Sequence, residues 1–246
     1  MTSTTPSTAA PAEPARGKSL LARIVGVFFS PRATYADVAA HPRWFGVMAI
    51  GVLLVAGGTF AFLSTEIGQQ AVMDQQVQVL ESFGVRLNEA QQAQMESRME
   101  SARYTGAISQ VVFIPLSAAV LAGILLAVFN ALMGGDATFK QAFSIVAHSG
   151  LIIALQTAFA LPLDYVRETM TSPTNLGVFA PLLEENSFMA RLLGSIDLFH
   201  IWTFVSLAIG LGVLYKRKTG PIATTIFIIY GVIVIALAAI RTALSS

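Results

Sequence analysis

The stretch Ala107–Met133, AISQVVFIPLSAAVLAGILLAVFNALM, decides the fold class because it contains no charged side chain. A helix needs about 20 apolar residues to cross the roughly 30 Å hydrocarbon core of a bilayer. Four further apolar runs have a similar character, and they are residues 45–63, 143–162, 198–215 and 221–240. Because the bilayer offers no water to backbone N–H and C=O groups, such runs must be helical. The sequence therefore predicts an all-α integral membrane protein with a bundle of five transmembrane helices.

The composition excludes several classes of function. Charged residues make up 12% of the chain, against about 25% in a soluble domain. Cysteine is absent, which excludes disulfides, thiolate metal sites and cysteine nucleophiles. The sequence also lacks the motifs of zinc proteases, serine hydrolases and P-loop nucleotide-binding proteins. We therefore expect no enzyme, no cofactor, no metal site and no nucleic-acid partner.

The distribution of basic residues predicts how the chain is oriented in the cell (inner) membrane. Cytoplasmic loops carry an excess of Lys and Arg. With the N-terminus in the cytoplasm, nine basic residues lie inside and six outside. The nine are Arg16, Lys18, Arg23, Arg32, Arg43, Lys140, Lys216, Arg217 and Lys218. No removable signal peptide precedes the first span, so we expect a cytoplasmic N-terminus and an extracytoplasmic C-terminus.

The region before the first span divides into two parts. Residues 1–17 are rich in Thr, Ser, Ala and Pro, which predicts a disordered cytoplasmic tail. Residues 18–43 form an expected cytoplasmic interfacial segment. Its first part has apolar residues at helical spacing, with Lys18 and Arg23 on the other side, as in a helix lying in the headgroup layer. The Ser30-Pro31 pair predicts the start of a second short helix. We expect the segment to contact anionic lipid headgroups.

Residues 44–246 form the expected membrane domain, and its long polar region is residues 66–104. We expect two helices that are broken at Gly84, with a capping box of Asn88 and Gln91 at the start of the second. This outer helical hairpin would extend the first two spans beyond the membrane. Two interpretations remain open: a solvated connector, or a surface that binds a membrane or extracytoplasmic protein.

His148 is the clearest candidate site residue inside a span. An ionisable side chain in a membrane helix is costly and is therefore a functional candidate. It lies about 10 Å from the cytoplasmic end of the third span, at the rise of an α-helix. A functional histidine would sense protons or contact a ligand. The structural alternative is a neutral imidazole that bonds to a neighbouring helix.

Asp197 and His200 form a second candidate, at the outer end of the fourth span. Their spacing of three places them on one helix face, so the pair could orient a general base or bind a metal. No third ligand stands at a fixed spacing. The alternative is an interfacial hydrogen-bond cluster beside Trp202. Asp164, at the outer end of the third span, could meet Arg167 or Arg191 at the surface, where such an ion pair is usually weak.

Two small-residue spacings could allow close packing of helices. They are Ala119-xxx-Gly123 in the second span and Ser206-xxx-Gly210 in the fourth. Small side chains let helix backbones approach each other in a membrane. The same spacing arises by chance in spans rich in Ala and Gly, so it assigns no specific pair.

Three segments of this chain resemble the Yip family of multi-pass membrane proteins, in its prokaryotic branch. They are Phe29-Ser30-Pro31-Arg32-Ala33-Thr34-Tyr35, Gly134-Gly135-Asp136-Ala137-Thr138-Phe139-Lys140, and Asp197-Leu198-Phe199-His200-Ile201-Trp202. The resemblance covers about residues 20–240 and implies a five-span bundle without a known catalytic residue. The Asp-Leu-Tyr-Gly-Pro motif of the eukaryotic trafficking members is absent, so binding of small GTPases is not implied.

Two functional hypotheses follow. The first is a non-enzymatic membrane protein that organises protein partners or lipids. The second is a small proton-linked transporter or channel that uses His148 with the Asp197–His200 pair. A water-lined path past His148 would favour transport, whereas a packed, dry bundle would favour the organising role. An intramembrane hydrolase is a more distant alternative, because no nucleophile and base stand together.

Overall fold

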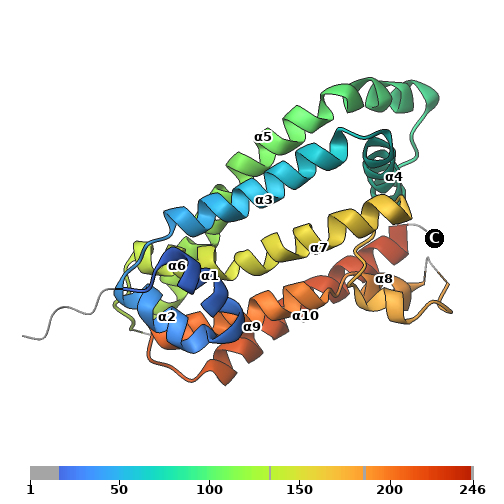
Figure 1. The fold of residues 1–246 in the computed structure, drawn as a ribbon. Helices are drawn as coiled ribbons and strands as arrows, with labels where there is room; N and C mark the ends of the chain where they lie inside the picture. Colours follow the sequence, from blue (N-terminus) through green and yellow to red (C-terminus); the bar gives the residue numbers. More distant parts are fainter. Residues whose placement is uncertain (1–16, 133, 185–186, 245–246) are drawn as a thin grey trace, which may run out of the picture.

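The computed structural model describes residues 17–132, 134–184 and 187–244, and these are almost entirely helical (Figure 1). No strand occurs among them, and the nearest feature is one isolated bridge between Asn175 and Asp197. The predicted tail at residues 1–17 lies outside this described part, apart from Gly17. The all-α class predicted from the sequence is confirmed.

The helices follow the apolar runs of the sequence. Their bounds are α1 Leu20–Phe29, α2 Pro31–Ala40, α3 Phe45–Leu63, α4 Glu66–Ser82, α5 Glu89–Ala127, α6 Phe139–Ser149, α7 Leu151–Arg167, α8 Phe188–Gly194, α9 Leu198–Leu214 and α10 Thr219–Leu244. A π-helical turn, Val128–Leu132, continues α5, and a 3₁₀ turn, Leu176–Phe179, precedes α8. Helix α3 has the bounds expected for the first span, and α6 and α7 together cover the third.

Four helical segments are long and apolar enough to cross a membrane. They are Phe45–Leu63, Glu89–Ala131, Phe139–Arg167 and Thr219–Leu244. Helix α9 is also apolar, but it is shorter, at 17 residues. Length and composition thus support a multi-span membrane protein with four such helices in the described part of the chain, and they leave the fifth expected span on α9 untested.

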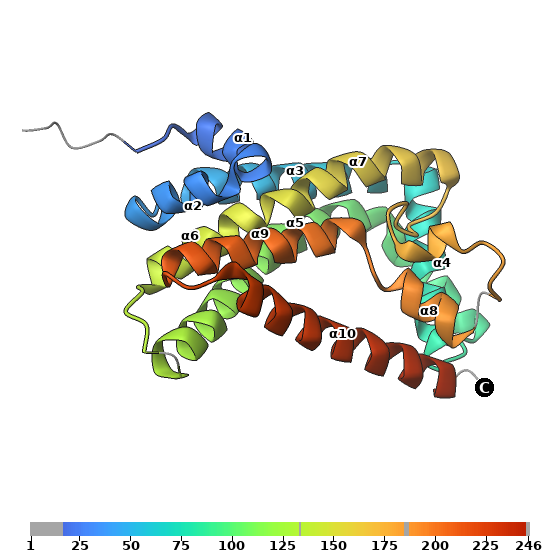
Figure 2. The same cartoon turned by 90° about the horizontal axis from the view of Figure 1, so that it is seen from below.

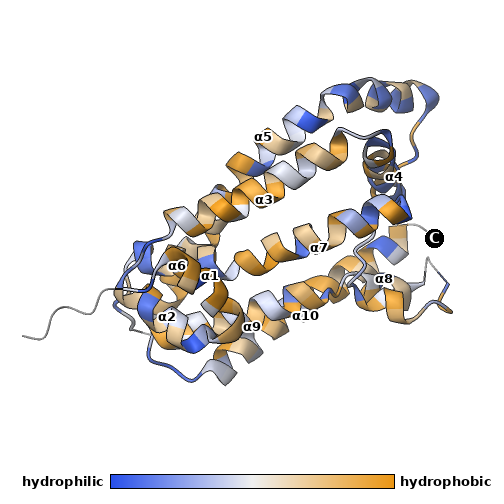
Figure 3. Ribbon diagram, viewed as in Figure 1, coloured by the Kyte–Doolittle hydropathy of each residue, from blue (hydrophilic) through white to orange (hydrophobic). Residues whose placement is uncertain are grey.

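Large apolar side chains cover the outside of the long helices, which is the pattern of a lipid-facing surface. Helix α5 exposes Ile108 and Val112 at 63% and 61%, and α10 exposes Ile228 and Val232 at 60% and 62%. Ala122 is the buried residue of α5. Figure 3 shows the apolar residues along the middle of the bundle and polar residues gathered toward its two ends. The outside of this bundle is therefore suited to hydrocarbon rather than to water.

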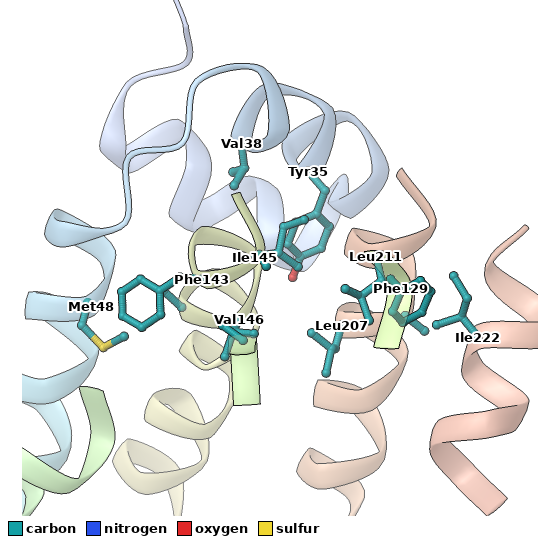
Figure 4. Close-up of a cluster of buried hydrophobic side chains, with 14 of the residues drawn as sticks. Tyr35, Val38, Met48, Phe129, Phe143, Ile145, Val146, Leu207, Leu211 and Ile222 are labelled. Atoms are coloured by element: carbon teal, nitrogen blue, oxygen red, sulfur yellow. The ribbon is translucent and has the colours of Figure 1, made fainter. Parts of the chain in front are cut away.

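The buried core lies toward one end of the molecule. We call this end the α2 end, and it contains helices α1 and α2 and residues 215–218. Residues from α2, α3, α5, α6, α9 and α10 meet there, with Ile145, Ala208 and Leu211 fully buried (Figure 4). The figure shows Tyr35 directed from α2 into the space between α6 and α9. Helix α2 thus closes this end of the bundle by inserting an aromatic side chain.

The opposite end, which we call the hairpin end, contains α4, the first half of α5 and residues 168–197. Gly84 has a φ of 76°, a value that glycine adopts at little cost, and it breaks the chain between α4 and α5 as predicted. Asn88 and Gln91 form the predicted capping box. Helix α5 does extend the second span. Helix α4 does not extend the first span: Thr65 starts a new helix, which crosses the hairpin end from α3 toward α10 (Figure 2).

Candidate functional site

A cluster of buried polar side chains lies under α1 and α2, at the α2 end. Its fully or almost fully buried members are Arg23, Thr34, Tyr35, Ser144, His148, Ser149 and Ser206. They come from α1, α2, α6 and α9, so segments far apart in the sequence meet here. Burying a polar group costs folding free energy unless the group is paired, so this cluster is the candidate functional site.

Arg23 makes a buried ion pair with Asp37, and this corrects the expected role of Arg23. Its Nε lies 2.7 Å from Asp37 Oδ2, and its Nη2 donates to the carbonyl of His41 at 2.9 Å. The Arg23 side chain is only 2% exposed. The expectation that Arg23 faces anionic lipid is therefore wrong, because an acid on α2 lies within its reach. Burial raises the pKa of Asp37, but the Lys18 N–H and the Arg23 guanidinium lower it more, so the net pKa lies below the usual range.

The rest of α1 is arranged around this ion pair. Gly26 brings α1 so close to α2 that a Cβ on it would lie 2.1 Å from Thr34 Oγ1. The opposite side of the helix exposes Leu21, Val25 and Phe29 at 70%, 47% and 84%. Helix α1 therefore buries its charge against α2, whereas its apolar side chains are divided between the core, which holds Val27, and the exposed side of the helix.

Tyr35 connects α2 to two other helices. Its hydroxyl lies 2.6 Å from Ser206 Oγ and 3.1 Å from Ser149 Oγ. A Cβ on Gly210 would lie 3.1 Å from the Tyr35 ring and 2.5 Å from Ile145. The Ser206-xxx-Gly210 spacing is thus used for close packing, with its serine as a hydrogen-bond partner and its glycine as the space for the ring. Gly123 of the other spacing has nothing within 4 Å of its Cβ position.

His148 is fully buried, next to the point where Gly150 separates α6 from α7. Its Nδ1 lies 2.6 Å from the carbonyl oxygen of Ser144, one turn earlier in the same helix. Its Nε2 has no hydrogen-bond partner among the described residues. The structural alternative for His148 was a hydrogen bond to a neighbouring helix. The described hydrogen bond is instead made within α6.

Asp197 and His200 make no hydrogen bond to each other among the described residues. Asp197 caps α9 by accepting from the Phe199 N–H at 2.8 Å. It also accepts from the hydroxyls of Ser172 and Thr174, so it anchors the preceding loop. His200 is exposed. The hydrogen-bond cluster that we considered as the alternative is present at Asp197, with loop residues rather than His200 as the partners.

Other sequence-based site expectations can be compared directly. Asp164 is only 4% exposed, so the expectation that it lies at the surface is wrong, and its Oδ1 has no hydrogen-bond partner in the described part. Among the described residues, no group of three or more His, Asp or Glu side chains could hold a metal. The sequence reasoning did not select Asp37 or Tyr35. The spacing of Asp37 and His41, one helical turn apart, was an available signal for a polar face on α2.

The fold and the buried cluster define a polytopic, all-helical membrane protein whose polar side chains lock helices together. The Yip1 domain model matches residues 25–240, so this chain belongs to the Yip1 domain family. It is 22% identical over 224 residues to "Membrane protein YknW" of Bacillus subtilis (strain 168), a match that covers 86% of this chain and 87% of the relative. No solved structure matches the chain.

Proposed function

We propose that this chain is a non-enzymatic, five-span membrane scaffold that organises protein partners or lipids in the cell membrane. In this proposal α9 is the fifth span, the α2 end faces the cytoplasm and the hairpin end faces outward. One observation carries the proposal: a polar hairpin stands at one end of the helical bundle and forms a groove between its two helices. Yip1 family membrane proteins are not known as enzymes, which agrees with it.

The groove lies between α4 and the first half of α5 and has a volume of about 330 Å³. Its lining residues combine apolar and polar character: Met73, Asp74, Val77, Gln78, Gln92, Met95 and Glu96. Methionine-containing grooves adapt to the shape of a partner, and carboxylates at the rim give it charge selectivity. We propose that the partner is a protein on the extracytoplasmic side that presents a basic, partly apolar surface.

A photo-crosslinking experiment in native membranes tests the hairpin. A crosslinking residue at Gln92, in the groove, should form a discrete protein adduct, whereas one at Val112, on the lipid-facing side of α5, should not. Glu96→Lys should abolish the Gln92 adduct because the new lysine cancels the remaining negative charge of Asp74 in the groove. Glu100→Lys makes the same change outside the groove and should leave the adduct intact. Loss of the adduct in both variants would contradict a specific groove.

A topology experiment tests the five spans. A reporter that is active only in the cytoplasm should work when fused after Lys218, which follows α9. The same reporter at the C-terminus should be inactive, because α10 carries the chain across the membrane. Equal activity at both places would remove the five-span arrangement.

Proton-linked transport is a second candidate, and the observation in its favour is the fully buried His148. Its Nε2 has no hydrogen-bond partner among the described residues, and ionisable side chains inside membrane helices mark proton and ligand pathways. Against it, His148 lines neither the groove between α4 and α5 nor the open cleft between α2, α9 and α10. Wild type and His148→Gln are reconstituted in liposomes with an internal pH dye, under a proton gradient. The scaffold predicts no protein-dependent flux from either, and flux that is lost in the variant would establish transport instead.

A further inference from the structure

An open cleft at the α2 end collects basic side chains. It has a volume of about 660 Å³ and lies between α2, the end of α9 and the start of α10. Basic residues make up half of its lining, which consists of Arg32, Ala36, Gly212, Val213, Lys216, Arg217, Lys218 and Thr219. The lining contains no acidic residue. The exposed side chains of Arg32, Lys216 and Lys218 therefore bring three positive charges to the described wall of the cleft.

The basic residues of the cleft differ from those of α1 in what they contact. Lys18 donates from Nζ to Thr34 and from its backbone N–H to Asp37, and Arg23 is paired with Asp37. These two cations serve the internal structure. Arg32, Lys216 and Lys218, in contrast, are exposed, and their charges are directed to the outside of the molecule.

The turn that carries the lysines is held in one conformation. Backbone bonds run from the Lys216 N–H to Val213 and from the Arg217 N–H to Gly212, at 3.3 and 2.8 Å. A Cβ on Gly212 would lie 3.0 Å from Thr219 Oγ1 and 3.1 Å from the Arg217 carbonyl oxygen. The turn therefore packs tightly against both α9 and α10, and the cleft is formed before any ligand arrives.

Lys216 occupies a backbone position at which glycine would be less costly. Its φ is 52°, in the left-handed region where a helix C-terminus usually has glycine. A lysine there accepts local strain and supplies a charge in return. A substitution to glycine at this position should therefore remove the charge without destabilising the turn.

In the proposed membrane placement, the cleft lies at the level of the cytoplasmic lipid headgroups. Helix α9 ends at Leu214, and the span-length helix α10 begins at Thr219. The N-terminus of α10 adds its positive dipole end to the same place. Basic clusters at the ends of membrane helices attract anionic lipids.

We infer that this basic cleft binds the phosphate group of an anionic phospholipid, with Arg32, Lys216 and Lys218 around the phosphate. The inference rests on the membrane placement in the proposed function and specifies its lipid. It does not depend on the hairpin, because the cleft and the groove are at opposite ends. If the Gln92 crosslink fails while the cleft still binds lipid, the hairpin proposal is wrong and the lipid inference stands.

The test measures lipid binding to the full chain in detergent by native mass spectrometry. The probes are phosphatidylglycerol, phosphatidylcholine and inorganic phosphate. The cleft variant is Lys216→Gly with Lys218→Gln. The control variant, Arg43→Gln with Lys140→Gln, removes two exposed charges before α3 and near the start of α6, outside the cleft lining. Each basic residue near an anionic surface contributes enough that the cleft variant should bind phosphatidylglycerol about 10-fold or more weakly.

The outcomes are distinct. Selective binding of phosphatidylglycerol that is lost in the cleft variant and kept in the control supports the inference. If inorganic phosphate binds as tightly as phosphatidylglycerol, the cleft is a phosphate site, and the inference that its ligand is a lipid is overturned. Equal losses in both variants would overturn the site, because a general effect of charge would explain them. Thermal unfolding controls for damage: Lys216→Gly alone should not lower the Tm, since glycine relieves the left-handed strain.

Discussion

The two ends of this molecule are built on different principles. The α2 end buries an arginine, a tyrosine and a histidine, and side chains from four helices interlock there. At the hairpin end, α4 buries only Gly68 and Ala71. Its contact with α10 includes Arg241 over the ring of Phe83, at 5.1 Å from the centroid. The comparison teaches that α4 is held by fewer buried side chains than the helices at the α2 end, although Asp197 anchors the loop beside it.

Removing the carboxylate of the buried ion pair should have the largest effect on stability. Asp37→Asn leaves Arg23 buried without its counter-charge, which should cost about 3 kcal/mol of unfolding free energy. Adding Arg23→Met should recover most of that loss, because the uncompensated charge is gone. Asp74→Asn at the hairpin end removes an exposed carboxylate and should change stability by about 0.5 kcal/mol or less. Equal losses at Asp37 and Asp74, measured by denaturant unfolding in detergent, would break the comparison of the two ends.

Substitution of glycine by alanine should lower the stability at one small-residue spacing and not at the other. A Cβ at position 210 meets Ile145 at 2.5 Å and the Tyr35 ring at 3.1 Å, so Gly210→Ala should cost about 1–3 kcal/mol through overpacking. Gly123→Ala meets nothing within 4 Å and should be neutral or slightly stabilising, since alanine is the better helix former. Unfolding of the two variants under identical conditions checks this. A loss at Gly123 as large as that at Gly210 would show that α5 is packed more closely than described.

Tyr35→Phe should have a moderate effect. It keeps the ring between α6 and α9 but removes the hydroxyl that contacts Ser149 and Ser206. Interhelical hydrogen bonds in membrane bundles contribute about 0.6 kcal/mol on average and up to about 1.7 kcal/mol, so we expect a loss of about 1 kcal/mol. In the Ser206→Ala background the further loss from Tyr35→Phe should be smaller. Full additivity in this double-mutant cycle would contradict the contact.

The pH dependence of unfolding should be the smallest effect that we predict. The folded-state pKa of Asp37 lies below its ordinary value, about 3.9, so near that pH the unfolded chain binds the proton more readily. The contribution of Asp37 is therefore present above about pH 4 and is lost as the pH falls through the folded-state pKa. Between pH 6 and pH 3 the Tm of wild type should fall more than that of Asp37→Asn. Parallel curves for the two proteins would show that the ion pair does not titrate as described.

Features that depend on neighbouring residues could be predicted from the sequence. The apolar runs predicted the long helices, and the spacing of Asn88 and Gln91 predicted the capping box that starts α5. Gly84 was correctly placed between two helices. Each of these depends on chemistry within a few residues, where helical geometry determines which groups meet.

Features that depend on distant contacts could not be predicted in this way. The helical pattern placed Arg23 opposite the apolar residues, but it does not say which face meets Asp37 on another helix. The contacts of Tyr35 with Ser149 and Ser206 span 114 and 171 positions of the chain. Ser206-xxx-Gly210 and Ala119-xxx-Gly123 have the same spacing, and only the first is closely packed at its glycine. For the candidate site, the sequence indicated the isolated polar residues but not the cluster that unites some of them.

Helix α5 also sets how far this protein can reach. It is a continuous helix of 39 residues, about 58 Å long at 1.5 Å per residue. The hydrocarbon core accounts for only about 30 Å of that length. In the proposed membrane placement, the remainder would hold the N-terminal capping box of α5 beyond the lipid headgroups. A partner could therefore be captured at a distance from the membrane surface, without a membrane anchor of its own.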